Sequence, residues 1–190
     1  MRLFVAIEVP EIERRRLVDW CAVQHWLEQD GAGLKWVAEG NLHLTLKFLG
    51  EVPDAEVPDV CDALGRVETN GPIPLHIQGL TCLPPRGRIG VVVAGISGDR
   101  DRLTTLQMDI DCRLKEIGFP QEGRIFRPHI TVARRRGRAH VSGLLRKSVA
   151  ECEEPLGKPF LVESFVLMSS KLTPTGAIYT PVARFSLTGK

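Results

Sequence analysis

Two short segments of the sequence combine histidine and threonine in the same order, HLTL at residues 43–46 and HITV at residues 129–132. Alternate side chains of a β-strand point to opposite faces. In each segment, a strand would therefore place the histidine and threonine on one face and the apolar residues in the core. A lone histidine on a strand is usually structural, but two matching segments in one chain predict a shared functional site.

Two imidazoles on either side of one phosphate supply both an acid and a base. Histidine titrates near neutral pH, so one neutral ring can take a proton from a nucleophile while one protonated ring gives a proton to the leaving oxygen. The hydroxyl groups of Thr45 and Thr131 can donate to phosphoryl oxygens and stabilise developing charge. His43 and His129 therefore indicate phosphodiester chemistry that needs no metal ion.

Charge is unevenly distributed along a chain whose net charge is only +2. The segment from Arg124 to Lys147 carries eight basic residues and no acidic one, whereas the segment from Glu51 to Asp62 carries five acidic residues and no basic one. Seven of the eight basic residues are arginines, which bind phosphate in a bidentate way. The basic segment either binds a polyanionic substrate or forms a solvated loop.

The elements that position these residues follow from periodicity and from Gly and Pro boundaries. Strands are predicted at residues 2–9, 34–37, 41–52, 73–84, 88–96, 127–135, 160–172 and 177–187, and helices at residues 11–30, 54–67, 99–117 and 139–149. His43 and His129 lie 86 residues apart, as do Leu75 and Leu161. This repeat predicts one domain over residues 1–190, with an α+β fold. We expect two lobes related by a pseudo-two-fold axis, with mainly antiparallel sheets around a central cleft.

Composition excludes several classes of protein. The 190 residues are 43% hydrophobic and 25% charged, which is typical of a globular domain and not of a disordered chain or coiled coil. No apolar run approaches the roughly 20 residues of a membrane-spanning helix, and the N-terminus lacks a signal cleavage site, so we expect a cytoplasmic protein. Five scattered cysteines without a C-x-x-C pair argue against a zinc site, and no glycine-rich phosphate loop is present. We therefore expect neither a metal nor a cofactor.

Four stretches carry a resemblance to a known family: RLFVAIEVP, WVAEGNLHLTLKFLGEV, FRPHITVARR and ESFVLMSSKLTPTGAIYTPVARFSL. They resemble the RNA 2′,3′-cyclic phosphodiesterase (2′-5′ RNA ligase-like) family of the 2H phosphoesterase superfamily, from Arg2 to about Leu187. The resemblance implies a bilobal fold with both motifs in a central cleft. It also implies an RNA-processing enzyme that opens a terminal 2′,3′-cyclic phosphate to a 2′-phosphomonoester without a cofactor. We expect RNA ends, such as those of tRNA fragments, as the partner, and a monomeric protein.

The resemblance also assigns roles to the residues of the two motifs. His43 matches the general acid, the proton donor that protonates the departing 3′ oxygen. His129 matches the general base, the proton acceptor that activates water. Thr45 and Thr131 match the threonines that bind the phosphate.

Further residues are expected to bind the substrate. Arg134, five residues after the second histidine, matches an arginine that contacts the phosphate or the terminal nucleotide. Phe48, five residues after the first histidine, matches a position where a base stacks, which suits single-stranded RNA. We also expect Tyr179, Phe126 and Trp36 to line the cleft.

Three alternatives stay open. The same groups could run the reaction backwards as an ATP-independent 2′-5′ RNA ligase, because microscopic reversibility uses the same acid and base. The chain could act on small cyclic nucleotides in place of RNA. It could also bind RNA without turning it over, although the complete motifs argue against this reading.

Overall fold

The computed structural model describes residues 1–24, 33–151, 156–174 and 176–188 and has an α+β fold. Its strands are β1 (Arg2–Glu8), β2 (Leu34–Trp36), β3 (His43–Glu51), β4 (Ile73–Leu83), β5 (Val91–Gly98), β6 (His129–Arg135), β7 (Phe160–Val162), β8 (Ser164–Thr173) and β9 (Gly176–Ser186). The α-helices are α1 (Glu11–Ala22), α3 (Val57–Gly65), α4 (Arg100–Glu116) and α5 (Leu144–Ala150), and short 3-10 helices span η1 (Glu39–Asn41) and η2 (Asp54–Glu56).

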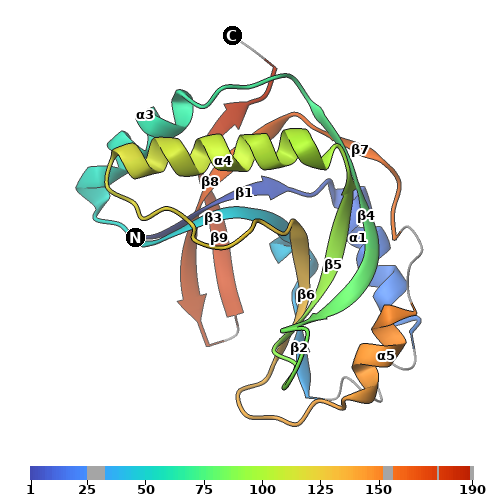
Figure 1. The fold of residues 1–190 in the computed structure, drawn as a ribbon. Helices are drawn as coiled ribbons and strands as arrows, with labels where there is room; N and C mark the ends of the chain where they lie inside the picture. The colour runs from blue at the N-terminus through green and yellow to red at the C-terminus, as the bar shows by residue number, and fades with distance from the viewer. Residues whose placement is uncertain (25–32, 152–155, 175, 189–190) are drawn as a thin grey trace.

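The described strands form one antiparallel sheet in the order β7-β4-β5-β6-β3-β1-β8-β9, with β2 paired to β6. The two central strands, β3 and β6, have one backbone-paired position, at which Leu44 lies opposite Ile130. Figure 1 shows that the sheet curls strongly here, with α3 and α4 together on one lobe and α1 and α5 on the other. The predicted bilobal, antiparallel α+β fold is confirmed, with the two lobes joined in one continuous sheet.

The two halves of the chain exchange strands. In the first half of the chain, β4 comes after β3 but pairs with β5 in the other lobe. In the second half, β8 comes after β6 and β7 but pairs with β1 in the lobe of β3. Leu75 and Leu161 lie on the neighbouring strands β4 and β7, where Leu161 pairs with Pro74. Because each half completes the sheet of the other, the two lobes are intertwined.

The two faces of the sheet differ in their packing. Along β1, Leu3, Val5 and Ile7 join the large hydrophobic core, which the helices cover. Phe4 and Ala6 point to the opposite face and form a small cluster with Val166, Met168 and Tyr179. We call this second face the cleft face.

The largest differences between the predicted elements and the structure lie in three places. The helix predicted at residues 11–30 ends at Ala22, and residues 25–30 of that prediction lie outside the described residues. The helix predicted at 139–149 begins at Leu144, because residues 136–139 form a turn in which the Ala139 amide donates to the Arg136 carbonyl at 2.7 Å. The strand predicted at 160–172 is broken between β7 and β8, where the chain passes from one lobe to the other.

Candidate active site

The two motif histidines occupy equivalent positions, each as the first residue of a central strand. Nδ1 of His43 lies 2.7 Å from the carbonyl oxygen of Asn41, and Nδ1 of His129 lies 2.7 Å from that of Arg127. A carbonyl oxygen only accepts hydrogen bonds, so Nδ1 of each ring must carry a proton and donate it. Each ring therefore keeps Nε2 as the nitrogen that can exchange a proton with a substrate.

The register of the central strands places the two motifs next to each other. Leu44 lies opposite Ile130. Because the two strands run in opposite directions, the residue before Leu44 is then nearest to the residue after Ile130, and the residue after Leu44 is nearest to the residue before Ile130. The histidine of each strand therefore lies across from the threonine of the other strand. All four side chains are partly buried on the cleft face, as the alternation in the sequence predicted.

A β-bulge in each central strand changes which residues face the cleft. Leu46 in β3 and Val132 in β6 are extra residues in the pairing with their neighbours β1 and β5. Each is followed by a second buried residue, so the side-chain alternation is reversed beyond the bulge. Phe48, which is 64% exposed, and Arg134 consequently lie on the cleft face with the motif residues.

Aromatic rings surround the first histidine. The imidazole of His43 lies 4.9 Å from the ring of Phe4 and 5.1 Å from the ring of Tyr179 between centroids, and these two rings are 5.0 Å from each other. The ring of Phe48 is 6.1 Å from that of Phe4. Tyr179 lines the site as predicted. Phe4 was not predicted from the sequence. Its position between Leu3 and Val5 was a usable signal, because side chains alternate along β1 and Phe4 therefore faces away from the large core.

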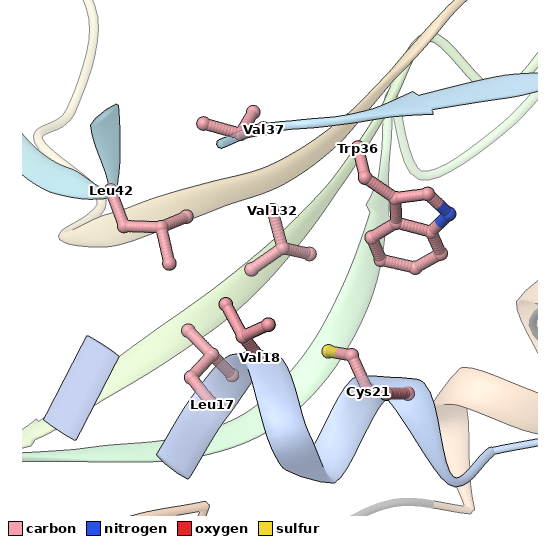
Figure 2. Close-up of a pocket in the computed structure, with 8 residues that line it drawn as sticks. Leu17, Val18, Cys21, Trp36, Val37, Leu42 and Val132 are labelled. Carbon is pink, nitrogen blue, oxygen red and sulfur yellow. The ribbon is translucent and has the colours of Figure 1, made fainter. Parts of the chain in front are cut away.

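Of the remaining expected cleft residues, Phe126 lies elsewhere and Trp36 borders both a cleft-side hollow and a pocket on the helix-covered side of β2. Phe126 packs against the large core, so its predicted place in the cleft is wrong. The indole of Trp36 points to the helix-covered side of β2, toward Cys21 and Val132 (Figure 2).

The basic segment does not act as one surface. Arg135 pairs across from Leu34 on the helix-covered side, whereas Arg134 lies on the cleft face. Nη1 of Arg146 donates to the carbonyls of Cys82 at 3.2 Å and Pro84 at 2.9 Å, so this arginine ties α5 to the end of β4. Of these three arginines, Arg134 is the one positioned for a substrate in the cleft.

The surroundings of His43 lower its pKa. Burial contributes most, and the positive charges of Arg134 and His129 contribute further, while the hydrogen bond to the Asn41 carbonyl partly opposes them. Glu8 lies across from His43 in β1, but its carboxylate pairs with Arg184. Positive charge therefore dominates on the side of the ring that faces the second motif.

Replacing Arg134 by glutamine is expected to raise the pKa of His43, because a nearby positive charge disfavours the imidazolium form and its removal relieves this. An NMR titration of the imidazole Hε1 signal measures the shift. Arg66→Gln, which removes an exposed arginine at the C-terminal end of α3, serves as the control and is expected to leave the pKa of His43 unchanged. An equal or lower pKa in Arg134→Gln would contradict this electrostatic account.

A hollow of about 320 Å³ adjoins the motifs on the cleft side. Its lining comes from β2 and the residues between it and η1, from η1, from β6 and from the ends of β8 and β9, and it comprises Lys35, Trp36, Val37, Ala38, Asn41, Arg134, Thr173, Gly176, Ala177, Ile178 and Tyr179. Nδ2 of Asn41 donates to the Ala177 carbonyl at 2.8 Å and joins the two sides of the hollow. The same asparagine accepts a hydrogen bond from Nδ1 of His43 through its own carbonyl, so the hollow lies beside the first motif histidine.

A second pocket, of about 210 Å³, lies between α1 and the helix-covered side of β2 and β6. Figure 2 shows Leu17, Val18 and Cys21 of α1 facing Val132 and Trp36 across it. The described residues that line it are apolar, and they include neither motif histidine, neither motif threonine, nor Arg134 or Phe48. This pocket offers no acid, base or phosphate ligand.

Two further properties concern the described ranges alone. No three or more His, Cys, Asp and Glu side chains there lie close enough together to hold a metal ion. Within the same ranges, no helix has the length and apolar character needed to cross a bilayer.

A curled antiparallel sheet that joins two His-x-Thr segments on one face defines a phosphoesterase of the two-histidine class. A family model described as LigT like Phosphoesterase matches residues 22–93 and 95–179 of the chain. The matched segments include both motifs and most of the strands. The chain belongs to this family of enzymes.

Curated relatives and solved structures agree with this assignment. The chain is 34% identical to an RNA 2′,3′-cyclic phosphodiesterase of Thermus thermophilus over 100% of this chain and 92% of the relative. It is 33% identical to one of Archaeoglobus fulgidus over 97% and 99% of the two chains. The crystal structure of E. coli LigT complexed with 3′-AMP superposes with a TM-score of 0.77 at 27% identity, covering 99% of this chain and 98% of that chain.

Proposed function

We propose that this chain hydrolyses the 2′,3′-cyclic phosphodiester end of RNA to a 2′-phosphomonoester by metal-independent two-histidine catalysis. The observation that carries the proposal is the matched pair of imidazoles on one face of two adjacent strands. Each has Nδ1 held by a backbone carbonyl, which leaves Nε2 for the substrate. The names of the curated relatives support RNA as the substrate, and 3′-AMP bound to E. coli LigT supports a ribonucleotide end.

In the proposed step, Nε2 of His129 takes a proton from water while the water oxygen bonds to phosphorus. The bond between phosphorus and the 3′ oxygen breaks, and His43 donates the Nε2 proton to that oxygen. The hydroxyls of Thr45 and Thr131 donate to the non-bridging oxygens as charge develops. The products are a 2′-phosphate and a 3′-hydroxyl, and a proton passes from His129 to His43 through solvent to restore the enzyme.

The role of His43 as the acid depends on the substrate. Its lowered pKa favours the neutral ring in the free enzyme, which by itself would suit a base. A bound cyclic phosphate carries a negative charge, and an adjacent anion favours the imidazolium form. We infer that substrate binding supplies the proton-donating form of His43, offsetting the positive charge of Arg134.

The substrate-binding residues extend from the same face. We infer that Arg134 contacts the phosphate or the terminal nucleotide, which its exposed position on the cleft face supports. Phe48 offers an exposed ring, beside Phe4, on which a terminal base can stack. A cytoplasmic location and a monomeric state are part of the same proposal.

The test is product analysis with EDTA-treated protein and a short RNA that ends in a 2′,3′-cyclic phosphate. We expect the mass to increase by one water and the product to resist a phosphatase specific for 3′-phosphates. A product sensitive to that phosphatase would keep the two-histidine site but reverse which ribose oxygen leaves. Loss of activity in EDTA that zinc or magnesium restores would contradict the metal-independent mechanism.

Two additions to the same assay address the alternative activities. A second RNA with a 5′-hydroxyl end reports 2′-5′ ligation, which would appear as a longer product without ATP. A cyclic mononucleotide reports activity on small substrates. If none of the three assays gives a product, the proposed function is overturned and the chain is better explained as a protein that binds RNA without turning it over.

A further inference from the structure

Two basic residues lie directly opposite each other beside the candidate active site. The register of β2 and β6 pairs Lys35 with Arg134, and both side chains are exposed. Like charges directly opposite on neighbouring strands destabilise a sheet. The pair concentrates positive charge on one wall of the hollow, and such a place attracts an anion.

The pair faces the cleft and not the helices. Trp36, the next residue in β2, pairs with the buried Ala133, and its indole points to the α1 side in Figure 2. Successive side chains of a strand alternate between faces. Lys35 therefore points to the cleft side with Arg134, and both residues line the hollow of about 320 Å³.

The opposite wall of the hollow is apolar. It comes from β9 and includes Ile178, which is 55% exposed, and Tyr179, whose ring contacts that of His43. The volume lies near the lower end of the roughly 300–1,000 Å³ of small-ligand pockets. A site with two cations on one wall and apolar surface on the other matches a nucleotide, with its phosphate on the cations and its base or ribose on the apolar side.

We propose that this hollow is a subsite for the nucleotide that precedes the cyclic end of the RNA, with Lys35 and Arg134 holding the phosphodiester between the last two nucleotides. The inference rests on the proposed function and adds to it. Arg134 and Tyr179 border both the hollow and the motifs. The RNA strand that runs from the cyclic phosphate toward its 5′ end therefore enters the hollow directly. The subsite makes an oligonucleotide end a better substrate than a cyclic mononucleotide.

The test compares two substrates, a nucleoside 2′,3′-cyclic phosphate and a dinucleotide with the same cyclic end, in the wild type and in Lys35→Gln. The variant is expected to lower the ratio of kcat/KM for dinucleotide over mononucleotide about tenfold, the effect of one charged hydrogen bond to phosphate. The loss should fall mainly on KM. The salt dependence of log(kcat/KM) for the dinucleotide should become shallower by about 0.7 per lost phosphate contact.

Two further variants complete the design. Lys35→Arg keeps the charge and is expected to retain the dinucleotide preference. Lys158→Gln, which changes an exposed lysine near β7, is the matched control and should leave the ratio unchanged. The subsite is wrong if Lys35→Gln leaves the ratio and the salt dependence at their wild-type values.

Binding measurements separate this inference from the proposed function. The dissociation constants of a dinucleotide and of a mononucleotide that both end in a 2′-phosphate require no turnover. If Lys35→Gln binds the dinucleotide more weakly than the wild type does but binds the mononucleotide equally well, the subsite is supported even if the wild type fails to hydrolyse a cyclic end. Equal binding of the dinucleotide by Lys35→Gln and the wild type would overturn it.

Discussion

His43→Ala and His129→Ala are each expected to lower kcat on a cyclic-ended RNA at least about a hundredfold, because assistance by a positioned acid or base contributes about 10²–10⁴. Both histidines act in the same proton transfer sequence. The double variant should therefore lose little more than the worse single variant, since residues that act as a unit are not additive. Steady-state kinetics on the RNA substrate measure all three.

His76→Ala is the matched control, because His76 lies on β4 and β5 separates that strand from β6. This control is expected to keep wild-type turnover. Thermal unfolding of each variant confirms that the fold is retained. Near-normal turnover in either motif variant would refute the acid–base assignment.

The second large effect concerns a buried ion pair behind the candidate site. Nζ of Lys47 donates to Asp111 and also to the Pro120 carbonyl at 2.7 Å. The carboxylate of Asp111 accepts from the Glu122 amide at 3.1 and 3.2 Å. The side chains of the pair are 3% and 6% exposed, so this network joins β3 to α4 and to the segment that follows it.

Asp111→Ala is expected to destabilise the protein by about 3–5 kcal/mol, because it leaves the charge of Lys47 buried without a counter-charge. For a chain of this size, that loss corresponds to a decrease in Tm of roughly 6–20 °C. Calorimetry measures the change in Tm. Urea unfolding measures the free energy of unfolding directly.

Arg15→Gln is the matched control for this pair. It removes an ion pair with Glu11 whose side chains are 63% and 69% exposed. Exposed pairs contribute about 0–1 kcal/mol. If Asp111→Ala lowers the free energy of unfolding no more than Arg15→Gln does, the buried pair contributes no more to stability than a surface pair.

The residues of the candidate site could largely be found from the sequence. Spacing and alternation identified both motifs and the face that each presents, since these properties depend only on neighbouring residues. Alternation alone would have placed Lys47 in the cleft and Phe48 in the core. The bulge at Leu46 reverses this, and the sequence carries no local signal for it.

The pairs that complete the site join residues far apart in the chain. Asn41 bonds to Ala177 across 136 residues, and Tyr179 reaches His43 from the last strand. Lys35 lies opposite Arg134 because β2 pairs with the C-terminal end of β6. Each contact depends on strand order and register, which are set by the packing of the whole sheet.

The sequence by itself therefore determined the class of chemistry, the four motif side chains and the α+β character of the fold. Only the tertiary structure decided that each histidine lies across from the threonine of the other motif, that Phe48 and Arg134 turn to the cleft, and that a basic hollow continues from it. The physical reason is that side-chain alternation is a local property of a strand. Pairing, bulges and the exchange of strands between the lobes depend on which distant segments bury their apolar faces together.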